Sequence, residues 1–177
     1  MTDWKSVNWG SVADWVSGIG SLSAALAALY VAQLSHRIEL DGYCGLRLLV
    51  GSGGPQQELF SINVTNKSPR PTKIINIGFT CGIWRWKKHG LITFMRDHVS
   101  EGIPKSLSDG EQAHFSVTLD ESRSWILDLV QKFEMSTLDV KTFRVHVYKS
   151  NGGRMTMKPE KPFLDVMYAE ARKRKHG

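Results

Sequence analysis

The sequence is poor in the residue patterns that hold metals or form disulfides. It contains only two cysteines, Cys44 and Cys81, which stand far apart among apolar neighbours. Because there is no CxxC pair and no Cys/His cluster, a zinc site is not expected. Nothing in the chain indicates an oxidising compartment, so both cysteines are predicted to be buried thiols. The six histidines share no metal-ligand spacing, and we expect neither a metal nor a cofactor.

Catalytic motifs are missing as well. The chain has no HExxH and no G-x-S-x-G sequence, and no nucleophile–base pair can be assigned. The glycine-rich stretch GSGGP (51–55) joins two predicted strands instead of opening a helix. It therefore lacks the helix N-terminus at which phosphate groups bind. The sequence predicts a protein that is not an enzyme.

Charge is absent from one long stretch near the N-terminus. From Trp15 to Leu34 there are twenty residues without a charged side chain. At about 1.5 Å per residue, a helix of this length crosses about 30 Å, the thickness of a membrane core. The pair Ser11 and Asp14 fits a helix-capping pattern, so the helix should begin near Val12.

The flanks of this stretch favour a membrane anchor over a cleaved signal peptide. Aromatic rings of the kind found at membrane interfaces stand near both of its ends: Trp4, Trp9, Trp15 and Tyr30. A signal peptide should begin with basic residues, whereas the start of this chain contains Asp3 and Asp14. We predict an interfacial N-terminus over residues 1–10 and a single transmembrane helix over residues 11–36. The alternative is a soluble helix over residues 12–35.

The distribution of charge predicts which side of the membrane the body faces. His36 and Arg37 follow the apolar stretch, and basic residues remain cytoplasmic. The first 41 residues carry two basic and four acidic side chains, so the remainder holds a net charge of +8 against +6 for the whole chain. We expect an inner-membrane protein whose C-terminal domain lies in the cytoplasm. A basic body favours anionic partners, although the same charge also serves solubility.

One side of the predicted helix carries a row of small residues. Every fourth position is small: Gly20, Ala24, Ala28 and Ala32. Such rows allow helix backbones to approach closely in lipid, so the row predicts self-association and a homo-oligomer. The alternatives are a helix packed on its own domain and a soluble helical bundle.

The pattern of apolar residues changes to a period of two from residue 42 onward, which predicts strands. Turn sequences rich in Gly, Pro and Asn separate seven of them: 44–50, 58–66, 73–84, 91–95, 113–119, 141–148 and 153–157. This pattern predicts a mainly β domain over residues 42–160, an antiparallel, immunoglobulin-like β-sandwich. Residues 120–133 are predicted to form a helix at one end, and residues 161–177 a basic C-terminal helix or tail.

Three stretches of the body resemble a group of uncharacterised bacterial and phage proteins. They are VTNKSPRPTKIINIGF, GIPKSLSDGEQAHFSVTL and YKSNGGR. In that group an N-terminal hydrophobic helix precedes an immunoglobulin-like sandwich, and the resemblance covers most of the chain. It implies the same architecture here. The shared motifs lie in turns and strands and carry no catalytic residue.

The most distinctive surface segment is WRWKKHG, residues 84–90. Alternation places Trp84 and Trp86 on the same side, beside cations, an arrangement suited to a nucleotide or a lipid headgroup. The turn NKSPRP adds two cations, and a single cationic rim would form if both loops lay at one end of the sandwich. The candidate ligand-binding residues are Lys67, Arg70, Arg85, Trp86, Lys87 and Lys88. The alternative is a strand end with core tryptophans and a solvated turn.

Three functions are compatible with these patterns. The first is a membrane-anchored, non-catalytic cytoplasmic binding or sensor domain that self-associates through its N-terminal helix. The second is a membrane effector gated by an anionic messenger, such as a cyclic oligonucleotide in antiviral defence. The third is a soluble phage structural or inhibitory protein with an oligomerising helix.

Overall fold

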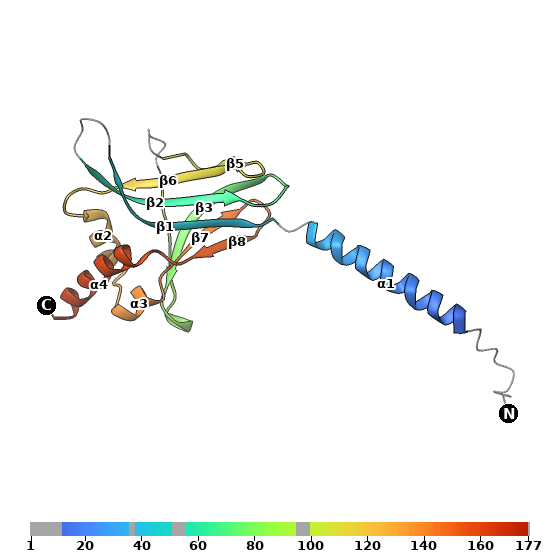
Figure 1. The fold of residues 1–177 in the computed structure, drawn as a ribbon. Coiled ribbons are helices and arrows are strands. Elements are labelled where there is room, and N and C mark those ends of the chain that lie inside the picture. The colour runs from blue at the N-terminus through green and yellow to red at the C-terminus, as the bar shows by residue number, and fades with distance from the viewer. Residues whose placement is uncertain (1–11, 36–37, 51–55, 95–99, 177) are drawn as a thin grey trace, which may run out of the picture. The chain divides into compact units, whose positions relative to one another are not determined.

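The computed structural model describes residues 12–35, 38–50, 56–94 and 100–176 (Figure 1). The chain divides into two compact units, Met1–Arg37 and Ile38–Gly177, the second of which is called the body below. The predicted interfacial N-terminus, residues 1–10, lies outside the described residues.

The described residues of the first unit form one helix, α1 (Val12–Ser35), which begins where the sequence predicts. All side chains from Val12 to Gln33 are exposed, so none of its faces is covered as a core helix would be. The hydroxyl of Ser23 donates a hydrogen bond to the carbonyl oxygen of Ile19 at 2.8 Å, which satisfies this polar group within the helix. By length and composition, α1 is able to cross a membrane.

The described residues of the body form eight antiparallel strands in two sheets. The three-stranded sheet has the order β1 (Leu40–Leu49), β2 (Gln57–Asn66), β6 (Gln112–Thr118). The five-stranded sheet has the order β4 (Lys88–Leu91), β3 (Thr72–Cys81), β7 (Arg144–Lys149), β8 (Arg154–Met157). The short β5 (Lys105–Leu107), which was not predicted, pairs with the same strand β3. The predicted antiparallel sheets are therefore confirmed, with one strand more.

The core lies between the sheets and is extended by aromatic side chains. Phe60, Ile62 and Val64 were predicted to share one face of β2, and each is 0% exposed. Phe60 stacks on Phe163 with ring centroids 4.3 Å apart, and Phe79 stacks on Phe143 at 5.1 Å. The ring of Phe143 in turn lies 6.1 Å from that of Phe163, so these rings connect both sheets to the C-terminal helix. Burial of this apolar surface is the main stabilising contribution to the body.

Three helices gather at one end of the sheets: α2 (Ser124–Lys132), α3 (Thr137–Lys141) and α4 (Lys161–His176) (Figure 1). The sequence predicted α2 from residue 120. It begins later because Arg123 has a left-handed φ of 54° and the Asp120 carboxylate accepts a hydrogen bond from the Ser124 amide at 2.7 Å. The C-terminal helix packs into the body through buried Phe163, Leu164, Met167 and Ala171.

The largest departure from the predicted strands lies in β3. The sequence predicts one continuous strand over residues 73–84 with Ile75 and Ile83 inside, but these side chains are 47% and 58% exposed. A bulge between Ile74 and Asn76 shifts the alternation by one residue, so Ile74 is buried instead. The strand ends at Cys81. The predicted strand 91–95 is replaced by β4, which begins three residues earlier.

Both cysteines are buried, free thiols, as predicted. Cys44 lies in β1 and Cys81 in β3, which belong to different sheets. Burial raises the pKa of Cys44 to about 12 and that of Cys81 to about 11. Because the thiolate is the reactive species, both side chains act as apolar core residues.

Candidate functional site

The loop between β3 and β4 carries the two most exposed tryptophans of the body. This tryptophan loop, residues 82–88, contains a short 3₁₀ turn (η2, Trp84–Trp86) in place of the predicted strand end. Trp84 is 84% exposed and Trp86 is 82% exposed, so the alternative of core tryptophans is wrong. Because Trp84 and Trp86 lie in a 3₁₀ turn and not in a strand, the alternation that predicted them on the same side does not apply.

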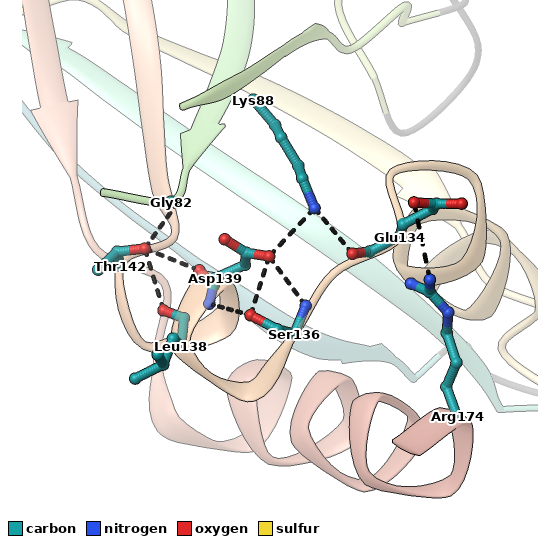
Figure 2. Close-up of polar contacts among 8 residues, drawn as sticks. All are labelled: Gly82, Lys88, Glu134, Ser136, Leu138, Asp139, Thr142 and Arg174. Atoms are coloured by element: carbon teal, nitrogen blue, oxygen red, sulfur yellow. Dashed lines mark hydrogen bonds and ion pairs between the residues drawn. The ribbon is translucent and has the colours of Figure 1, made fainter. Parts of the chain in front are cut away.

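The first residue of the tryptophan loop is fixed to the end of α3. Gly82 has a φ of +92°, and a Cβ there would collide with the carbonyl oxygen of Trp86, so only glycine fits. The Gly82 amide donates to the hydroxyl oxygen of Thr142 at 2.8 Å (Figure 2). That hydroxyl lies 3.1 Å from the carbonyl oxygens of Leu138 and Asp139. The start of the loop is therefore tied to the backbone of a helix.

The last residue of the loop, Lys88, is held by two acceptors (Figure 2). Its ammonium group donates to the Glu134 carbonyl oxygen at 2.7 Å and to the Asp139 carboxylate at 3.2 Å. The same carboxylate oxygen accepts from the amide and the hydroxyl of Ser136, completing the capping box of α3. Burial alone would raise the pKa of Asp139, but these hydrogen bonds and Lys88 outweigh it and hold that pKa below its ordinary value. Lys88, a predicted ligand-binding residue, is therefore an anchor of the loop.

Between these anchors the loop presents two indole rings beside two cations. Arg85 and Lys87 are exposed, and neither forms an ion pair with any residue that the structure describes. Trp84 has a φ of +47°, a left-handed conformation that costs a non-glycine residue about 1–2 kcal/mol. The exposed side chain makes no core contact that would offset this cost. Backbone strain of this kind is concentrated at binding sites. The arrangement is suited to stacking on planar groups and to neutralising an anion.

Lys67 and Arg70, the other predicted cations, lie at the opposite end of β3. Ten strand residues at about 3.3 Å each separate the two loops by about 30 Å, so a single cationic rim does not form. Lys67 pairs with Asp41, whereas Arg70 is exposed. Their turn is built around Asn66, whose side chain is completely buried.

The sequence did not predict a binding surface on the outer face of the five-stranded sheet. Alternation predicts that Arg144 and His146 point outward, opposite to the buried Val145 and Val147. Arg144 is half-buried, whereas His146 is only 5% exposed and is covered by its neighbours on the outer face. His146 lies between Thr80 and Thr156, with its ring nitrogens 2.7 and 2.8 Å from their hydroxyl oxygens. The outward side chains form three rows across the strands: His89, Thr80 and Arg144; Leu91, Gly78, His146 and Thr156; Asn76, Tyr148 and Arg154. We call this surface the basic sheet face.

Two outward strand histidines, His114 and His146, could meet across strands by the sequence pattern, with solvated positions as the alternative; in the structure they lie in different sheets. His114 belongs to the three-stranded sheet, where its Nδ1 lies 2.8 Å from the Asn63 side-chain oxygen, while His146 belongs to the other sheet. Among the described residues, no group of three His, Cys, Asp or Glu side chains is arranged to hold a metal ion. Among the hollows of the described residues is a groove of about 700 Å³ between α2 and β4, lined mainly by apolar side chains such as Leu91, Ile92 and Phe133.

Neither a protein-family model nor a curated protein matches this chain. Functional interpretation therefore depends on the geometry of the helix, the tryptophan loop and the basic sheet face.

Proposed function

We propose that the protein is a membrane-anchored, non-catalytic binding or sensor domain, whose α1 helix crosses the inner membrane once and whose body lies in the cytoplasm. The observation that carries the proposal is the exposure of apolar side chains on every face of α1. Trp15, Leu22 and Leu29 are 57%, 62% and 58% exposed, and no charge lies between Trp15 and Leu34. A helix that is apolar all round requires a protein core or hydrocarbon around it.

The proposed orientation and fold subclass have separate support. His36 and Arg37, followed by a body of net positive charge, favour the cytoplasmic side. In immunoglobulin-type sandwiches the first, second and fifth strands share one sheet, and the third, sixth and seventh share the other. The orders β1-β2-β6 and β3-β7-β8 follow this scheme when the two short strands β4 and β5 are set aside and the fourth strand of the scheme is given no counterpart among the described residues, so that β6 takes the fifth position. An experimental structure with another strand order would contradict the immunoglobulin-like assignment.

We assign the contact with an anionic ligand to the tryptophan loop. Arg85 and Lys87 supply positive charge, and Trp84 and Trp86 supply planar surface. The loop lies about 30 Å, the length of β3, from the end of the body that contains Ile38, to which Lys149 is hydrogen-bonded. The cations and indole rings of the loop suit an anion that carries a planar or apolar part, as a nucleotide or a lipid headgroup does.

A single charge in the centre of α1 should abolish membrane association. Asp at the centre of a helix costs about 2.5–3.5 kcal/mol of insertion free energy, which is comparable to the whole contribution of the leucines in a span this weak. We expect Leu26→Asp, and equally removal of residues 1–36, to move the protein from the membrane fraction to the soluble fraction. The matched control is Leu138→Asp, at a residue of the body that is 61% exposed. Retention of Leu26→Asp in carbonate-washed membranes would refute the anchor.

The same helix is proposed to join copies of the chain through its small-residue row. Gly20, Ala24, Ala28 and Ala32 are exposed, and nothing lies within 4 Å of a Cβ placed on Gly20. Ala24→Leu should prevent close approach of two backbones and convert the detergent-solubilised oligomer to a monomer. Ser23→Leu adds bulk outside the row and should leave the oligomer intact. The measurement is the mass of the detergent-solubilised protein by light scattering, and the same mass for Ala24→Leu and the wild type would contradict this interface.

A further inference from the structure

The basic sheet face contains no acidic side chain. The outward positions of β3, β4, β5, β7 and β8 hold lysine, arginine, histidine, small polar and apolar residues, and all of these positions lie within the described residues. Arg144 and Arg154 lie in the first and third rows, about 13 Å apart along the strands at about 3.3 Å per residue. Lys73 lies beyond the third row and is exposed. The cations therefore run the length of the sheet.

The charged groups around His146 indicate a positive electrostatic potential over this face. Burial is the main cause of its lowered pKa, and the positive charges of Arg154 and His89 lower it further. Among the described residues, no acidic side chain contributes to this shift. A face of one charge sign concentrates ligands of the opposite sign.

Planar and apolar surface lies between the cations. Tyr148 is half-buried in the third row, with its ring centroid 6.3 Å from that of His146. Gly78 lies in the second row, where a Cβ would approach the Gly90 carbonyl oxygen too closely, so no side chain stands between Leu91 and His146. Leu91 beside it is 65% exposed. A face with an aromatic ring, an exposed apolar side chain and cations at both ends is suited to unpaired bases joined by phosphates.

We propose that the basic sheet face binds single-stranded nucleic acid, with phosphates neutralised by Arg144, Arg154 and Lys73 and a base stacked on Tyr148. A duplex would present its phosphates but keep its bases out of reach of the tyrosine ring. The inference goes beyond the proposed function because it concerns a different surface, and it holds whether or not α1 enters a membrane.

The test measures fluorescence anisotropy of labelled oligothymidylate and oligouridylate of about 20 nucleotides, long enough for one binding domain. The full-length chain in neutral detergent is titrated into each, at salt concentrations of about 50 to 200 mM. We expect Arg144→Ala/Arg154→Ala to weaken binding at least about tenfold and to reduce the slope of log affinity against log salt by about 1.4, since each phosphate contact contributes about 0.7. Tyr148→Ala should weaken binding about tenfold.

The control for lost charge is Lys132→Ala/Lys161→Ala, at two exposed residues on α2 and α4. This variant removes the same charge and should change the affinity less than about twofold. Melting temperatures near that of the wild type establish that every variant is folded. Equal losses in the control and in the Arg144/Arg154 variant would overturn the proposal, as would equal affinity for duplex DNA or no binding by the wild type at low salt.

A second variant separates this inference from the proposed function. If Trp84→Ala/Trp86→Ala abolishes oligonucleotide binding while Arg144→Ala/Arg154→Ala does not, the tryptophan loop is the contact surface and the inference fails. If only the arginine and Tyr148 variants lose affinity, the inference stands and the ligand of the loop is a different molecule. Leu26→Asp, which tests the membrane anchor, should bind the oligonucleotides as the wild type does.

Discussion

Replacing Phe163 by alanine should lower the free energy of unfolding of the body by about 3–5 kcal/mol. The side chain is 0% exposed, and its ring lies 4.3 Å from that of Phe60 and 6.1 Å from that of Phe143. Truncation removes an aromatic ring that lies between the three-stranded sheet and α4, and the rigid neighbours cannot close the cavity. Urea unfolding followed by tryptophan fluorescence measures the change.

Trp84→Ala serves as the contrasting substitution. It removes a larger aromatic side chain, yet that side chain is 84% exposed, so the free energy of unfolding should change by less than about 0.5 kcal/mol. A wild-type urea midpoint for Phe163→Ala would mean that α4 does not contribute to the core. A large loss for Trp84→Ala would mean that the indole ring is packed in solution.

Replacing Asn66 by alanine should cost about 2–4 kcal/mol of stability, because several buried polar groups lose their partner. The side-chain amide nitrogen lies 2.8 Å from the Arg70 carbonyl oxygen, and 3.1 and 3.3 Å from those of Ser108 and Leu107. The side-chain oxygen accepts from the amide and the hydroxyl of Ser68 at 3.1 and 2.6 Å. One asparagine thus joins the β2–β3 turn to the β5–β6 turn.

Asn66→Asp provides a sharper version of this test. The side chain keeps its shape but loses its donors, and a carboxylate would face three carbonyl oxygens in a buried site. The folded protein should raise the pKa of this carboxyl, so stability is lost as the pH rises and is partly regained as it falls from neutrality. The neighbouring exposed Lys67→Ala should have little effect. A pH-independent loss for Asn66→Asp would contradict the described hydrogen bonds.

The sequence predicts the long regular elements of this protein because a single periodicity continues through them. Twenty uncharged residues define α1, and strict alternation in β2 predicts the buried positions of Phe60, Ile62 and Val64. Prediction fails where one residue interrupts the period. The bulge after Ile74 reverses the faces of Ile74 and Ile75, while Ile77 and Phe79 beyond it are buried as predicted. The left-handed Arg123 delays the start of α2. The residue types at the bulge and at Arg123 do not predict these backbone conformations, which depend on packing between elements distant in sequence.

The candidate site, too, could be predicted from the sequence only in part. Aromatic and basic residues in one short segment made the tryptophan loop visible in the sequence, but its anchoring by Lys88, Thr142 and Asp139 required the structure. The basic sheet face could not be predicted from the sequence, because only the register of β3, β7 and β8 places Arg144 and Arg154 on the same surface. The absence of acidic residues from one face is likewise a property of pairing.

Glu134 is shared by two contacts that otherwise belong to separate parts of the body. Its carbonyl oxygen holds Lys88 at the end of the tryptophan loop, and its carboxylate lies 3.8 Å from the guanidinium group of Arg174 on α4 (Figure 2). A ligand that drew Lys88 away would remove its hydrogen bond to the Glu134 carbonyl oxygen. The backbone at Glu134 would then be freer, and the contact of this residue with Arg174 on α4 would weaken. If this change alters the contact with Arg174, occupancy of the tryptophan loop and the position of α4 are thermodynamically linked, and the linkage acts equally in both directions.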